Sequence, residues 1–138
     1  MSLATMTPFL RRALKADAWI SAAAGVAMSL GASVLQDLLQ LPSSLLLAAG
    51  VALFPWAGFL LWLAAKPAVP SAAVWTVIAL NAVWIVDSAW VSLGGSFQPN
   101  ALGHAFIAAQ ALAVLVLAEL EFMGLKRSTG APALSSRG

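Results

Sequence analysis

Four long apolar stretches constrain the fold more than any other feature of this sequence. They cover residues 18–35, 45–65, 72–93 and 101–118, and none of them contains lysine or arginine. An α-helix needs about 17 to 25 such residues to cross roughly 30 Å of hydrocarbon. Barrel strands would instead alternate apolar and polar residues in segments of about ten. We therefore predict an all-α, polytopic membrane protein, a four-helix transmembrane bundle with spans at about 17–38, 44–65, 71–93 and 100–122.

Composition supports lipid as the solvent of a single domain. Of the 138 residues, 62% are hydrophobic and 9% charged, whereas soluble domains are about half apolar and a quarter charged. The transmembrane domain is predicted over residues 1–127, and the small, polar segment 128–138 as a disordered cytoplasmic tail. The sequence has no cysteine, which excludes disulfide and thiolate chemistry.

The basic residues indicate the orientation of the chain in the membrane. All seven fall before the first span, between the second and third, or after the fourth, whereas the loops at 36–44 and 94–100 have none. Because cytoplasmic loops are enriched in lysine and arginine, the pattern predicts that both termini are cytoplasmic (N-in, C-in) in a multi-pass protein of the bacterial inner membrane. The basic residues form no continuous face, so no nucleic-acid partner is expected. They are Arg11, Arg12, Lys15, Lys66, Lys126, Arg127 and Arg137.

Polar residues near the cytoplasmic ends of the spans are interpreted as interfacial. Asp17 lies at the start of the first span, and Glu119 and Glu121 at the end of the fourth, each beside basic residues. We expect these acids to form interfacial ion pairs. Thr7-Pro8 is typical of a helix start, and the short helix that follows is expected to turn four apolar residues toward lipid. These are Phe9, Leu10, Ala13 and Leu14.

A row of small residues marks one face of the first span. Ser21, Gly25, Ser29 and Ser33 recur at four-residue spacing, and such ridges let a second membrane helix approach closely. We therefore predict a helix-packing ridge. The alternative is a polar conduit lined by the serine hydroxyls, which is weaker because serine in a helix can bond back to its own backbone.

The third and fourth spans hold most of the polar residues that would lie in hydrocarbon. Asn81 and Asp87 are on the third span, and His104 and Gln110 are on the fourth. An ionisable residue at the bilayer centre costs roughly 2.5 to 3.5 kcal/mol on insertion scales, so Asp87 is expected to face protein or a water-filled cavity. If the two spans are antiparallel neighbours, pairing Asp87 with His104 places Asn81 level with Gln110. Two indoles close to mid-membrane, Trp84 and Trp56, complete this candidate polar site.

The pair of Asp87 and His104 allows three interpretations. One is a structural clamp. Another is a protonation switch, because a nearby carboxylate raises the pKa of a histidine whereas burial lowers it. The third is a single histidine ligand to a tetrapyrrole cofactor. No catalytic triad, phosphate loop, paired intramembrane carboxylates or metal-binding cluster is recognisable, so the sequence argues against an enzyme, names no catalytic residue or metal site, and leaves any cofactor unknown.

Several short segments together form a recognisable pattern. They are Arg12 to Asp17-Ala18, Leu41-Pro42, Gly50 with Pro55, Asn81 to Trp84 with Asp87-Ser88, and Ala118 to Glu121. In this pattern the chain resembles small four-span bacterial inner-membrane proteins of uncharacterised function, and it is loosely similar in length and span count to DoxX-like proteins. The resemblance implies no activity.

The sequence favours a structural or accessory subunit of a membrane complex, with another membrane protein or a second copy as partner. The alternatives are a small transporter or proton-coupled channel using Asp87 and His104, and a cofactor-binding membrane protein.

Overall fold

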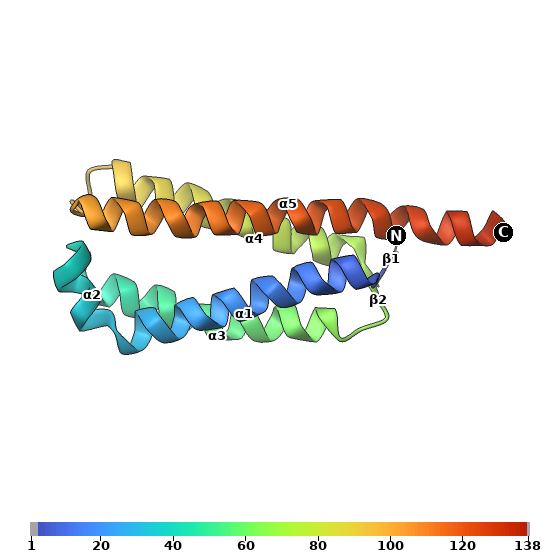
Figure 1. The fold of residues 1–138 in the computed structure, drawn as a ribbon, viewed down its shortest axis with the longest axis horizontal. Helices are drawn as coiled ribbons and strands as arrows, with labels where there is room; N and C mark the ends of the chain where they lie inside the picture. Colours follow the sequence, from blue (N-terminus) through green and yellow to red (C-terminus); the bar gives the residue numbers. More distant parts are fainter. Residues whose placement is uncertain (1–2, 138) are drawn as a thin grey trace.

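Long helices form the body of the protein, and a small two-stranded sheet closes one end (Figure 1). The computed structural model describes residues 3–137, with side chains over residues 3–128. In chain order the elements are β1 (Leu3–Thr5), α1 (Pro8–Leu30), α2 (Ala32–Leu39), α3 (Ser43–Ala64), β2 (Ala68–Pro70), α4 (Ser71–Leu93) and α5 (Ala101–Arg137).

The helices have the length and composition of membrane spans. Three are long and apolar enough to cross a bilayer, namely α3, α4 and the Ala101–Ser128 part of α5, and α1 with α2 would make a fourth if the bent pair is one span. Large apolar side chains also cover the outside, among them Val86 and Leu112. A protein with an apolar interior and an apolar exterior requires lipid as its solvent, so the chain is an all-helical, multi-pass membrane protein.

The first span differs from its prediction at both ends. α1 begins at Pro8 with Thr7 as its N-cap, whose hydroxyl accepts a hydrogen bond from the Leu10 amide at 3.2 Å. It ends at Gly31, and α2 continues from there at 86° to α1. The predicted helix over 17–38 is therefore wrong, because an average of hydropathy over an apolar run does not register a glycine that ends a helix.

Small residues bring α1 and α3 into close contact. A Cβ added to Gly25 would lie 2.9 Å from the Gly50 carbonyl oxygen, and one added to Gly50 would lie 2.8 Å from the Ser29 hydroxyl. The backbones can approach this closely because neither position has a side chain. Of the other ridge residues, Ser21 is buried one turn before Gly25 on α1, whereas Ser33 lies beyond the bend and is exposed on α2.

The two strands hold the N-terminus against the loop between α3 and α4. β1 and β2 are antiparallel, with Ala4 opposite Val69, and both of these residues are fully buried. This contact draws the start of α1 into the protein, where Leu10 and Leu14 belong to the apolar core with Leu60. The prediction that Leu10, Ala13 and Leu14 face lipid is therefore wrong, since all three are buried.

The same end extends α5 beyond its predicted limit. Gly124 lies against Leu10, and Leu125 and Ser128 are buried beside the start of the chain. Packing against β1 and α1 thus favours helix past residue 122, where the fourth span was expected to end. The helix then continues to Arg137, over the segment predicted as a disordered tail.

The helices associate as two pairs. α1 packs along α3 and α4 along α5, and α1 also contacts α5, whereas α3 and α4 make almost no backbone contact (Figure 1). Across the far end, Asn100 Nδ2 donates to the Leu38 carbonyl at 2.8 Å and ties α2 to the start of α5. Contact between α3 and α4 is therefore made by side chains rather than by close approach of the backbones, as in the apolar core that Leu60 of α3 shares with Val77 of α4.

Candidate functional site

The predicted pair of Asp87 and His104 is not formed. The Nδ1 atom of His104 is hydrogen-bonded to the Ser92 hydroxyl. Asp87 is exposed, and within residues 3–128 its side chain has no hydrogen-bond or ion-pair partner. The reason is the register of the two antiparallel helices, in which His104 is level with Ser92 and Gln110 is level with Trp84 and Ser88. Asp87 lies farther from the loop than His104 does.

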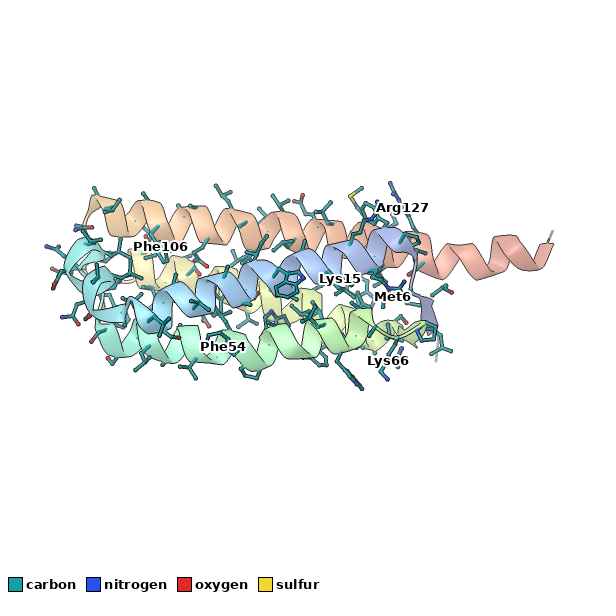
Figure 2. All side chains as sticks on the ribbon, turned by 60° about the horizontal axis from the view of Figure 1, so that its bottom comes forward. Met6, Lys15, Phe54, Lys66, Phe106 and Arg127 are labelled. Carbon is teal, nitrogen blue, oxygen red and sulfur yellow. The ribbon has the colours of Figure 1, made fainter. Side chains whose placement is uncertain are left out.

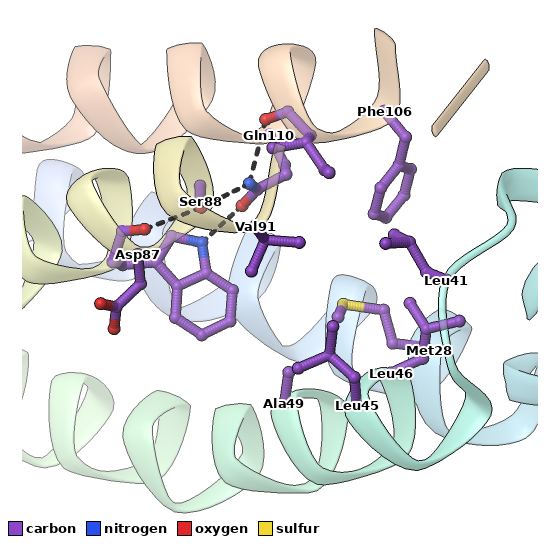
Figure 3. A pocket seen from close by; sticks show the side chains of 12 residues that line it. Met28, Leu41, Leu45, Leu46, Ala49, Asp87, Ser88, Val91, Phe106 and Gln110 are labelled. Carbon is purple, nitrogen blue, oxygen red and sulfur yellow. Dashed lines mark hydrogen bonds between the residues drawn. The ribbon is translucent and has the colours of Figure 1, made fainter. Parts of the chain in front are cut away.

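The predicted level pairing of Asn81 with Gln110 is wrong for the same reason. Gln110 instead lies between Trp84 and Ser88, one helical turn apart on α4, and bonds to both (Figure 3). The Trp84 indole N–H donates to Gln110 Oε1, and Gln110 Nε2 donates to the Ser88 hydroxyl at 2.8 Å. Ser88 in turn donates to the Trp84 carbonyl at 2.7 Å. All three polar side chains are satisfied, so this group is a clamp that holds α4 to α5.

Asn81 is the centre of a second polar group, in which three helices meet. Its Nδ2 atom donates to Asp17 Oδ2 of α1 and to Glu121 Oε1 of α5, each at 2.9 Å. The Ser21 hydroxyl donates to the other Asp17 oxygen, Oδ1, at 3.2 Å. Asp17 is 2% exposed, Asn81 4% and Glu121 0%. We call these four residues the acid cluster.

The acid cluster overturns two predictions. Asp17 and Glu121 do not form interfacial ion pairs, since their partners are an amide and a hydroxyl inside the protein. Paired carboxylates, which the sequence did not reveal, are therefore present within the helices. The contacts of β1 bring the start of α1 against α5, where Gly124 lies against Leu10, and this places both acids inside the helical assembly. Glu119, two residues before Glu121, is exposed and lies outside the acid cluster.

One sequence signal could have located the acid cluster. Asp17 precedes Ser21 by four residues and so continues the spacing of the small-residue ridge toward the N-terminus. Residues four apart lie on one face of a helix. An acid on the contact face of a membrane helix is directed at other helices rather than at headgroups, and it needs a partner there.

Two cavities lie between α3 and α4. One, of about 200 Å³, has apolar walls that include Leu45, Ala49 and Phe106 (Figure 3). The other, of about 270 Å³, is lined by Asp17, Ser21 and Asn81 of the acid cluster and by Trp56 of α3. Trp84 and Asp87 line both cavities. We refer to the two cavities together as the α3–α4 groove.

The groove and the acid cluster give the candidate site its chemistry. The walls of the groove are mostly apolar, and the acid cluster lies on its inner wall. Among the residues within 3–128 that line the groove, Asp87 is the one charged side chain without a partner. Within that described part of the chain, no group of three or more histidine, cysteine, aspartate or glutamate side chains is arranged to hold a metal ion. This arrangement can bind an apolar group that carries a hydrogen-bond donor.

Comparison with known proteins adds no relative: no family model, no curated protein and no solved structure matches this chain. The fold and the site therefore define the protein by their own features. It is an all-helical membrane protein with an open groove between two of its helices and a buried pair of carboxyl groups beside that groove.

Proposed function

We propose that the protein is an accessory subunit of a membrane complex and that its α3–α4 groove holds a transmembrane helix of another protein. The observation that carries the proposal is Asp87, an exposed carboxylate in an apolar helix with no partner among the described side chains. A charge in this position costs several kcal/mol unless it is paired or hydrated. A partner helix that supplies a hydrogen-bond donor removes that cost.

The shape of the groove supports a helical occupant. α3 and α4 are 22 and 23 residues long and make almost no backbone contact, so cavities are left between their side chains. The cavities, about 200 and 270 Å³, are too small for a helix and of the right size for its side chains. A helix lying along the opening would insert side chains between α3 and α4, as membrane helices pack in general.

Asp87 determines the chemistry of the occupant. A lysine, arginine or amide side chain at the depth of Asp87 would complete a charge-assisted hydrogen bond, which is stronger than a neutral one. The remaining lining residues offer apolar contact, with side chains such as Leu45, Ala49 and Val91. The transporter alternative depended on Asp87 and His104 acting together, and these residues have different surroundings. The cofactor-binding alternative depended on His104 alone and stays a prediction.

We further infer that the protein lies in the bacterial cytoplasmic membrane with both termini on the cytoplasmic side. Lys66 and Arg127 lie at the same end of the protein as Met6, and Phe106 lies toward the other end (Figure 2). Segregation of basic residues to one end supports this orientation of a four-span domain.

Site-specific photo-crosslinking in native membranes tests the proposed occupant. A photoreactive amino acid at Ala49, inside the groove, should crosslink to a transmembrane segment of another protein that contains a basic or amide side chain. The same amino acid at Leu112, which is 61% exposed on α5, is the control and should not. Asp87→Leu should reduce the Ala49 product several-fold, because the donor of the partner then loses its acceptor.

Three results would contradict the proposal. A product of twice the mass of the chain would identify a second copy as the occupant. Crosslinks from Ala49 to lipid alone would mean that the groove is filled by acyl chains. A protein product that forms equally at Leu112, or that persists in Asp87→Leu, would show contact without recognition.

A further inference from the structure

The hydrogen bonds of the acid cluster leave one oxygen without a partner. Asp17 and Glu121 have four carboxyl oxygens between them, and Asn81 and Ser21 donate to three of these. The fourth, Glu121 Oε2, is fully buried and has no hydrogen-bond partner. A buried carboxylate oxygen without a donor is costly, so this atom requires a proton, a water molecule or a cation.

The distances within the cluster favour a proton. Both carboxyl groups lie 2.9 Å from the same nitrogen atom, Asn81 Nδ2, so the two groups are neighbours that share one donor. Two carboxylates at such a separation do not both remain ionised, and a shared proton is the usual solution.

Nearby charges do not compensate the two acids. Asp17 is the titratable side chain that faces Glu121 from α1, and α4 contributes the neutral Asn81. Arg11 of α1 donates instead to the Ala64 carbonyl at 2.8 Å. On α5, Lys126 lies over the Phe122 ring and Arg127 lies over the Phe9 ring, at 5.7 and 4.5 Å from the ring centres, and Glu119 is exposed. The remaining cations of α1, Arg12 and Lys15, are exposed.

We propose that Asp17 and Glu121 form a proton-binding site, in which a single proton is shared between the two carboxyl groups under the Asn81 amide. The bound proton leaves one negative charge, which the Asn81 and Ser21 donors stabilise. Because the cluster joins α1, α4 and α5, the proton also stabilises the contact of these three helices. The cavity of about 270 Å³, which is part of the groove, is lined by Asp17, Ser21 and Asn81 and gives the proton a route out of the cluster.

Infrared spectroscopy of the full-length protein in lipid bilayers tests the site directly. A protonated carboxyl group has a C=O stretch that a carboxylate lacks, and an ordinary glutamate loses its proton at about pH 4.3. The wild-type protein should therefore retain one carboxyl C=O band at neutral pH. Glu121→Gln should abolish this band, and the matched control Glu119→Gln, two residues away on the same helix, should leave it unchanged. Asp87→Asn should also retain it, which separates the acid cluster from the other intramembrane acid.

Stability measurements in detergent give a second readout. If the folded state holds one proton more than the unfolded state, the free energy of unfolding must fall as pH rises above the range in which ordinary glutamate titrates. The wild type should show this loss toward alkaline pH, and Glu121→Gln, whose amide can donate permanently to Asp17, should not. Asp17→Asn provides the reciprocal variant if Glu121→Gln does not fold.

Each alternative outcome overturns the proposal. Absence of a carboxyl band in folded wild-type protein at neutral pH would mean that both acids are ionised, whatever the variants do. Loss of the band in Asp87→Asn would mean that the protonated carboxyl group is Asp87 and not a member of the acid cluster. Stabilisation by sodium chloride but not by choline chloride, abolished by Glu121→Gln, would show that the site binds a cation in place of the proton.

Discussion

Replacing Gly25 with alanine measures how closely α1 and α3 must approach. The added Cβ would lie 2.9 Å from the Gly50 carbonyl oxygen and 3.3 Å from the Leu53 Cβ, whereas ordinary contacts are 3.4–4 Å. The Gly50 oxygen belongs to the backbone and cannot rotate away, so the two helices must separate by several tenths of an ångström. Overpacking of this kind costs about 1 to 3 kcal/mol.

Gly58→Ala is the matched control for this substitution. Gly58 lies on α3 and has no atom within 4 Å of an added Cβ. Both variants gain about 0.5 to 1 kcal/mol from the better helix propensity of alanine, so their difference isolates the packing term. In unfolding by denaturing detergent, Gly25→Ala should be less stable than Gly58→Ala by about 1 to 3 kcal/mol. Equal free energies of unfolding would mean that the close approach of α1 and α3 does not occur.

Two further predictions concern the clamp and the orientation. Trp84→Phe and Gln110→Leu should each reduce the free energy of unfolding by about 0.5 to 1.5 kcal/mol. The double variant should lose less than the sum, because both remove the same hydrogen bond, and additive losses would refute the clamp. A reporter that is active only outside the cytoplasm should be silent after Lys66 and active when inserted between Gly95 and Pro99. Activity at Lys66 would contradict the proposed orientation.

The limits of α3 and α4 could be predicted from the sequence because local chemistry decides them. α4 spans Ser71–Leu93, as expected. Pro70 precedes its first residue and favours a helix start there, and Gly94 follows its last apolar turn and favours a helix end. α3 begins at Ser43, directly after Pro42, for the same reason. Hydropathy and helix-terminating residues agree at these positions, so no tertiary information is needed.

The other regions depend on contacts that a single sequence does not reveal. The β1–β2 pair joins residues far apart in the chain, and its strands are three residues each, too short for a recognisable pattern. That contact draws α1 and the end of α5 into the protein and thereby buries Asp17 and Glu121. The register predicted between α4 and α5 was wrong because it rested on matching polar residues in the sequence, whereas Gln110 pairs with Trp84 and Ser88, and His104 with Ser92.

The groove and the acid cluster are connected through α4. Asn81 and Asp87 lie six residues apart on this helix, about 9 Å along its axis, and the clamp at Trp84 and Ser88 fixes the intervening turn to α5. α4 has almost no backbone contact with α3, and the hydrogen bond from Asn81 to Asp17 is one of the contacts that set its position relative to α1. Loss of the shared proton would leave two negative charges that repel each other beside Asn81, which would favour a shift of the helices and so alter the width of the groove. A partner helix held at Asp87 would oppose such a change, so proton binding and partner binding must favour each other if both act on the position of α4.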